Sequence, residues 1–118
     1  MEKNLEVSTL LDFYADLLTE NQRQALSLYY NEDFSLAEIA ENQGITRQGV
    51  RDTVQKAQVQ LFELEKKLHV AQRFKDVEEK AQVILENVEK ILLANDLDSV
   101  KALAIGIKNA AKSIQKEQ

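Results

Sequence analysis

SLAEIAENQGITRQGVRDTVQKAQVQL, residues 35–61, decides the fold of this chain. Ser35 and Glu38 have the spacing of a capping box, in which a hydroxyl and a carboxylate satisfy two of the backbone N–H groups left unpaired at a helix start. Gly44 follows where a left-handed residue can end the helix. Ile45 is expected to pack into the turn, and Thr46 can cap a second helix. The stretch therefore predicts a helix-turn-helix motif.

The second helix of the motif is expected to hide Val50 in the angle between the two helices and to direct hydrogen-bond donors outward. Donor side chains contact base edges and phosphates when such a helix lies in the major groove. Two polar residues near the start of an earlier helix could lie near the DNA backbone. The alternative is that the motif is only a packing device with a solvated polar face. The candidate DNA-binding residues are Thr46, Arg47, Gln48, Arg51, Gln55, Lys56, Gln22 and Arg23.

Charge limits the strength of any DNA binding. The chain carries a net charge of −5. Residues 2–41 hold nine acidic residues against two basic ones, a balance of −7, whereas residues 46–60 hold three basic residues against Asp52, a balance of +2. Because phosphate neutralisation supplies most non-specific affinity, binding to double-stranded DNA is expected to be weak and salt-sensitive. Asp52 faces phosphate unfavourably unless it pairs with Lys56, four residues on.

Two further helices are expected before the motif. One extends from Leu5 to Leu18 with a broad apolar side. The other starts after Thr19, which forms a second capping box with Gln22, and ends at Asn31. Three aromatic residues of these helices are expected to be half-buried in the core with solvated hydroxyl groups: Tyr14, Tyr29 and Tyr30.

Beyond the motif, apolar residues continue at alternating steps of three and four, which is a heptad pattern. The pattern slips by one residue between Ala71 and Phe74. A bend or short break is therefore expected near residues 68–72, the alternative being a continuous helix that is locally overwound. Asn95 and Asp96 then mark a turn into a last helix. Residues 1–70 are expected to form one domain, and residues 71–118 a helical hairpin.

A two-helix hairpin buries too little apolar surface to offset its ordering entropy, about 1.5 kcal/mol per residue. The hairpin should therefore need further cover, either from the helix that starts near Val50 or from the hairpin of a second chain. We expect a homodimer, since two-fold pairing also sets two reading helices side by side. The residues expected to serve oligomerisation are Leu61, Leu64, Leu68, Phe74, Val77, Ile84, Val88, Ile91, Leu103, Ile107 and Ile114.

Composition bounds the remaining function classes. Three Gly, no Pro and no Cys predict an all-α chain without disulfides or thiolate chemistry. His69 is the only histidine, and there is no phosphate-binding loop or nucleophile motif, so we expect no enzyme activity, metal, cofactor or small-molecule substrate. No window approaches the ~20 apolar residues of a membrane span, and a cytoplasmic protein that does not bind membranes is expected.

LTENQRQALSLYYNEDFSLAEIAENQGITRQGVRDTVQKAQVQL, residues 18–61, resembles the fourth region of bacterial sigma factors, which reads promoters with a helix-turn-helix. Together with LLDFYADLLTENQ before it and the helical extension after Leu61, roughly the first 70 residues are more similar still to the YlxM family of helix-turn-helix proteins. The resemblance implies a sigma region-four-like, or winged-helix-like, domain in residues 1–70. It also implies that five of the candidate residues occupy positions that sigma factors use for base and phosphate contacts: Arg47, Gln48, Arg51, Gln55 and Lys56.

The resemblance to YlxM proteins further implies a regulatory role in the signal recognition particle pathway of protein targeting. Two function classes stay open at this point. In the first, a dimer binds DNA through the second helix of the motif. In the second, the chain is an adaptor that binds the GTPase of the signal recognition particle and no DNA, a role that would suit an acidic protein with one basic stripe.

Overall fold

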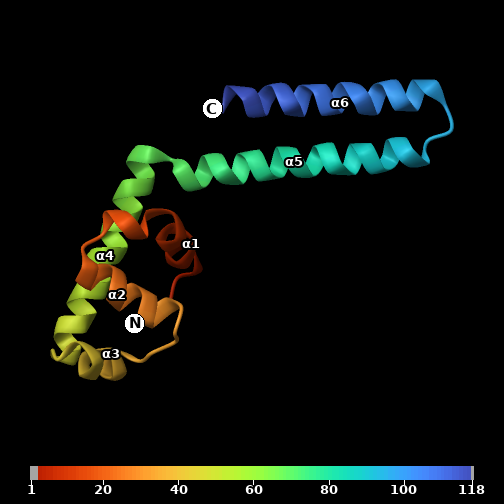
Figure 1. The fold of residues 1–118 in the computed structure, drawn as a ribbon. Helices are drawn as coiled ribbons and strands as arrows, with labels where there is room; N and C mark the ends of the chain where they lie inside the picture. The colour runs from red at the N-terminus through yellow and green to blue at the C-terminus, as the bar shows by residue number, and fades with distance from the viewer. Residues whose placement is uncertain (1–2, 118) are drawn as a thin grey trace. The chain divides into compact units, whose positions relative to one another are not determined.

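The structure, a computed structural model, describes residues 3–117, and every regular element in that range is helical. This confirms the all-α prediction. The contacts divide the chain into two compact units, residues 1–71 and residues 72–118. Figure 1 labels the α-helices. In chain order the elements are α1 (Leu5–Tyr14), η1 (Ala15–Leu17), α2 (Glu20–Tyr30), α3 (Leu36–Gln43), α4 (Arg47–Leu68), α5 (Val70–Leu93) and α6 (Leu97–Lys116).

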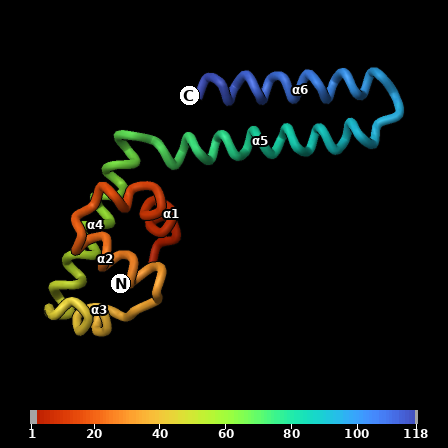
Figure 2. The backbone as a smooth tube through the Cα atoms, viewed as in Figure 1, coloured from red at the N-terminus to blue at the C-terminus, as the bar shows by residue number. Residues whose placement is uncertain are grey.

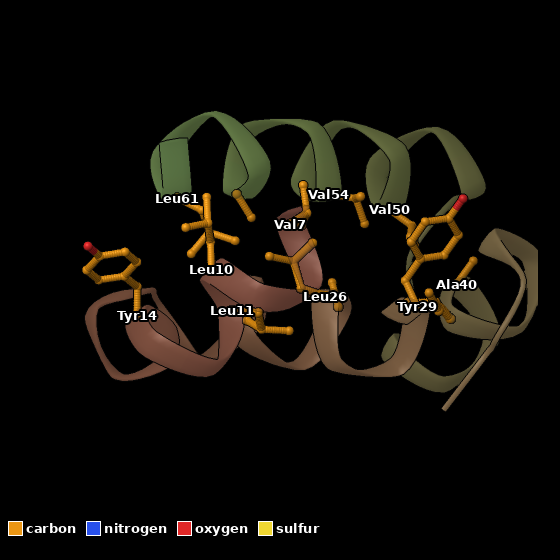
Figure 3. Close-up of a cluster of buried hydrophobic side chains, with 13 residues drawn as sticks. Val7, Leu10, Leu11, Tyr14, Leu26, Tyr29, Ala40, Val50, Val54 and Leu61 are labelled. Carbon is orange, nitrogen blue, oxygen red and sulfur yellow. The ribbon is translucent and has the colours of Figure 1, made fainter. Parts of the chain in front are cut away.

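In the first unit, α1, α2 and α3 pack against the N-terminal part of α4. Figure 3 shows Val50, Val54 and Leu61 of α4 pointing toward side chains of α1 and α2, such as Leu10 and Leu26. Burying each such side chain stabilises the fold by about 1.5–3 kcal/mol. The whole core, which contains no polar or charged residue among those described, consists of Val7, Leu10, Leu11, Tyr14, Ala25, Leu26, Tyr29, Ile39, Ala40, Val50, Val54, Ala57 and Leu61.

The starts of the helices follow the predicted capping residues. Thr19 and Gln22 form a complete capping box at the start of α2, with each side chain bonded to the other residue's backbone N–H at 3.2 Å. Asp96 caps α6 by accepting a 2.8 Å hydrogen bond from the Ser99 N–H. These caps depend on residues three positions apart, and this is why the sequence reveals them.

The first helix is shorter than predicted. The α-helix ends at Tyr14, and the chain continues as a single 3₁₀ turn to Leu17 instead of remaining α-helical to Leu18. Leu18 is extended, because the chain must leave the helix before Thr19 can cap α2. Leu17, at the end of the 3₁₀ turn, is more than half exposed.

Tyr14 corrects the expectation of a solvated hydroxyl. Its side chain is 2% exposed. The hydroxyl donates a 2.5 Å hydrogen bond to Oε1 of Glu65 and accepts a 3.1 Å bond from the Val70 N–H. Oε1 of Glu65 also accepts from the Ala71 N–H at 3.0 Å. Burial, followed by the bond to Glu65, raises the pKa of Tyr14, so the tyrosine acts as a neutral donor that ties the end of α1 to α4 and to the first residues of α5.

The predicted break after residue 68 is present. His69 adopts a left-handed conformation with φ of 55°, and its N–H donates to the Glu65 carbonyl at 2.9 Å, which ends α4. Two of the N–H groups that α5 leaves unpaired at its start are then satisfied by the side chains of Tyr14 and Glu65. The heptad slip therefore corresponds to an interruption of one residue, and the continuous-helix alternative was wrong.

The second unit is an antiparallel hairpin of α5 and α6. Figure 2 shows the two helices running side by side and joined by a short turn. Side chains also link them, because the Asn87 amide donates to the Leu103 carbonyl at 3.3 Å and Nζ of Lys80 bonds Oε1 of Glu117 at 3.1 Å. No described residue of either helix is buried. Over residues 3–117, no helix has both the length and the apolar character that crossing a bilayer requires.

Candidate nucleic-acid interface

The helix-turn-helix motif comprises α3, the turn at Gly44 and α4. Ser35 caps α3 and forms the predicted box with Glu38, at 3.1 Å and 3.0 Å. Gly44 has φ of +69° and ends α3, and the N–H of the next residue, Ile45, donates to the Ala40 carbonyl at 3.1 Å. An added Cβ at Gly44 would meet no atom within 4 Å. The glycine is therefore required by backbone conformation alone.

Ile45 does not fill the turn as predicted. It is 45% exposed, and its Cδ1 lies only 3.6 Å from the position that a Cβ on Gly49 would take. The angle between α3 and α4 is filled instead by Ile39, Ala40 and Val50, so Ile45 covers the backbone of the first turn of α4 from outside. Thr46 caps this turn as predicted and accepts a 3.0 Å hydrogen bond from the Gly49 N–H.

α4 has a sharp division between its two sides. One side is held in the core by Val50, Val54 and Ala57, which are fully buried. The opposite side is exposed and carries Gln48, Arg51 and Gln55 at positions i, i+3 and i+7 of one stripe. The six candidates from the motif, all of which are exposed, are Thr46, Arg47, Gln48, Arg51, Gln55 and Lys56.

The three basic residues among the α4 candidates have no acidic partner within residues 3–117. Arg47, Arg51 and Lys56 form no ion pair in that part of the chain. Asp52 accepts a 3.0 Å hydrogen bond from the Gln48 amide rather than pairing with Lys56. The sequence did not indicate that a shallow hollow of about 340 Å³ opens beside this stripe, lined by Leu36, Arg47, Gln48 and Arg51.

Gln22 and Arg23 lie on α2 and are already engaged in local contacts. The Gln22 side chain closes the capping box with Thr19. The guanidinium of Arg23 forms an ion pair with Glu20, and that bond lowers the pKa of the Glu20 carboxyl. A phosphate contact from Arg23 would have to compete with Glu20, so this side of the interface offers less free positive charge than α4 does.

The oligomerisation candidates divide between the two units. Leu61 is fully buried in the core of the first unit, and Leu64 packs against that core, so both serve the fold of the single chain. Leu68, Phe74 and Val88 are exposed. The remaining six are partly buried, at the spacing of the seam between α5 and α6: Val77, Ile84, Ile91, Leu103, Ile107 and Ile114.

Comparison with known proteins identifies the family. Residues 1–100 match the model of UPF0122, described as "Putative helix-turn-helix protein, YlxM / p13 like". A UPF0122 protein of Clostridium novyi is 36% identical over 109 residues, which is 92% of this chain and 95% of that relative. One from Clostridium kluyveri is 40% identical over 86% of this chain and 94% of its own length, and one from Halalkalibacterium halodurans is 41% identical over 82% and 89%. The chain belongs to the UPF0122 family of YlxM- and p13-like helix-turn-helix proteins.

Proposed function

We propose that this protein is a non-enzymatic regulator that binds double-stranded DNA by placing the first turns of α4 in the major groove. The observation that carries the proposal is the division of α4 between its two sides. Its buried side fixes the helix against α1, α2 and α3. Its other side presents Arg47, Gln48, Arg51 and Gln55 to solvent, and within residues 3–117 neither arginine forms an ion pair with an acidic residue.

The chemistry of these side chains suits base recognition. The major groove admits an α-helix, arginine donates two parallel hydrogen bonds to guanine, and glutamine both donates to and accepts from adenine. Arg47 and Arg51 lie one turn apart, about 6 Å along the helix axis. The Thr46 hydroxyl oxygen caps the helix by accepting from the Gly49 N–H, and we assign this residue a structural role at the groove edge.

The small number of cations sets the expected salt dependence. Each neutralised phosphate contributes about −0.9 to the slope of log K against log salt concentration. Three contacts from Arg47, Arg51 and Lys56 give a slope of roughly −3. The net negative charge of residues 2–41 repels the DNA phosphates and lowers the affinity further. Binding is therefore expected to be measurable at low salt and lost near physiological ionic strength.

Arg51→Ala tests the proposal, with Arg73→Ala as the matched control because Arg73 is an exposed arginine in the second unit. Fluorescence anisotropy with labelled duplex DNA is measured from low to moderate salt. We expect Arg51→Ala to weaken binding by about 1–3 kcal/mol, or to reduce the salt slope by about 1 if the contact is to phosphate. Arg73→Ala should leave both unchanged. Equal binding by the two variants, or no binding by the unchanged protein at low salt, would contradict the proposal.

A second candidate function rests on the acidic character of the first 41 residues. A balance of −7 over residues 2–41 favours a basic protein partner, since complementary charge speeds association. The partner we propose for this case is the GTPase of the signal recognition particle, with the chain acting as an adaptor in protein targeting. Retention of the purified GTPase by the immobilised protein, together with no binding to duplex DNA at low salt, would favour this function over the first.

A further inference from the structure

The hairpin of α5 and α6 has a second apolar stripe beside its seam. On α5 the stripe contains Leu85, 58% exposed, and Leu92, 78% exposed, with Val88 between them. On α6 it contains Leu97, 65% exposed, followed by Ala104 and Ala111 at steps of seven. Steps of three, four and seven keep residues on one side of a helix. Each helix therefore carries an apolar row that its partner in the hairpin leaves exposed.

The two rows lie on the same side of the hairpin. Four of the row residues come directly after a seam residue in the sequence. Each of these four is therefore rotated by about 100° around the helix axis from its seam residue. The helices are antiparallel (Figure 2), so a turn in the same sense along each chain leads to the same side of the pair. The neighbouring pairs of seam and row residues are Ile84 and Leu85, Ile91 and Leu92, Leu103 and Ala104, and Ala110 and Ala111.

Charges of opposite sign border the two rows. On α5 the outer border holds Glu78 and Glu89, and on α6 it holds Lys101, Lys108 and Lys112. All five side chains are exposed, and none forms an ion pair within residues 3–117. The hairpin therefore presents an apolar face with one acidic edge and one basic edge. If a second copy is rotated by half a turn about an axis parallel to the helices, its basic edge faces the acidic edge of the first copy, and its acidic edge faces the basic edge.

We propose that this face binds the same face of a second copy of the chain, with α5 of each copy against α6 of the other in a four-helix bundle. Two face-to-face arrangements have two-fold symmetry. An axis perpendicular to the helices places α5 against α5, which brings the acidic edges together and the lysines together. An axis parallel to the helices places α5 against α6 and pairs acids with lysines. Charge complementarity selects the second arrangement.

The register of the hairpin aligns these charges. The bond from Asn87 to the Leu103 carbonyl and the Lys80–Glu117 pair set which residues of α5 and α6 lie at one height. A two-fold axis parallel to the helices preserves those heights. Glu89 of one copy then lies opposite the interval between Lys101 and Lys108 of the other, and Glu78 lies close to the level of Lys112. Long lysine side chains can close the remaining offsets.

The proposal of this dimer does not rest on the proposed DNA binding, because the interface contains no residue of α4. The dimer would nevertheless affect how two chains bind one DNA duplex. A two-fold axis parallel to α5 places the start of α5 of both copies at the same end of the bundle. The covalent connections to the two helix-turn-helix units then lie at the same end of the bundle, which suits recognition of two half-sites on one duplex.

Charge reversal on one edge tests the arrangement without touching the seam. The full-length protein is studied by sedimentation equilibrium, and the unchanged chain is expected at twice its 13.5 kDa mass. Glu78→Lys/Glu89→Lys should raise the dimer Kd at least about tenfold, because lysines then face lysines. Lys101→Glu/Lys108→Glu/Lys112→Glu should do the same. Mixing the two variants should restore dimers, since both interfaces of the mixed pair are complementary.

Glu79→Lys/Glu86→Lys is the matched control, because it makes the same change of charge on the same helix away from the apolar face. It should dimerise like the unchanged protein. Circular dichroism at high protein concentration checks that each variant remains helical. The proposal is overturned if the unchanged protein is a monomer at every concentration. It is also overturned if the Glu78/Glu89 variant dimerises normally, as pairing of α5 with α5 requires, or if the two reversed variants do not combine.

Discussion

The two units of this protein are built from the same secondary structure but differ in how they are stabilised. In the first unit, helices as short as the eight residues of α3 are held by capping boxes and by a core of thirteen buried apolar side chains. In the second, the 24 and 20 residues of α5 and α6 contain no buried residue among those described. Because most helix stability in proteins comes from packing, α5 and α6 are expected to depend on a partner despite their length, whereas α4, of 22 residues, is held by the core of its own unit.

The largest expected contrast is between two leucines. Leu26 is fully buried in the first unit, so Leu26→Ala should cost about 2–5 kcal/mol in the free energy of unfolding. Leu85 is 58% exposed, so Leu85→Ala should cost less than about 1 kcal/mol in dilute solution, where the second unit has no partner. Urea denaturation of both variants measures the difference. Equal costs would show that the second unit has a core of its own.

A smaller effect is expected at the turn of the motif. Gly44→Ala should destabilise the first unit by about 1–2 kcal/mol, because alanine is strained at a φ of +69° although space for its Cβ is open. Thermal melting followed by circular dichroism measures the loss. An unchanged melting temperature would show that residue 44 does not hold this conformation in solution.

The smallest expected effect is the response of the first unit to acid. The backbone N–H of Ser35, and secondarily its hydroxyl, hold the pKa of Glu38 below its ordinary value of 4.5. Because the folded state lowers this pKa, the stabilisation is present above the ordinary value and is lost as pH falls through the folded value. Glu38→Gln should keep the capping box, as Gln22 does in α2, and should reduce this acid sensitivity in denaturant titrations between pH 5 and about 2. Identical pH profiles would contradict the assignment.

The features that the sequence predicted are local. The two capping boxes, the Gly44 turn and the cap at Asp96 each depend on residues within a few positions of one another. The resemblance to YlxM proteins rests on roughly the first 70 residues, which contain all of these features except the cap at Asp96. The apolar spacing likewise separated the buried from the exposed side of α4, and all six candidate residues from the motif are exposed.

The features that the sequence did not predict depend on distant contacts. The bond from Tyr14 to Glu65 joins residues 51 positions apart, and no pattern in either segment indicates it. The heptad spacing marked one apolar stripe on α5, but both the seam and the exposed row have the same period, so spacing alone could not separate them. Ile45 was expected inside because it is apolar, yet Ile39 and Val50 already fill the angle between the helices.

Hydrogen exchange at two protein concentrations tests the central difference between the units most directly. Amide protection in α1 to α4 should be the same below and above the concentration at which dimers form, because that unit is stabilised by its own core. Protection in α5 and α6 should increase strongly with concentration, because those helices gain their cover from a second copy. Protection in α5 and α6 that equals that of α4 in dilute solution and does not depend on concentration would contradict this dependence on a second copy.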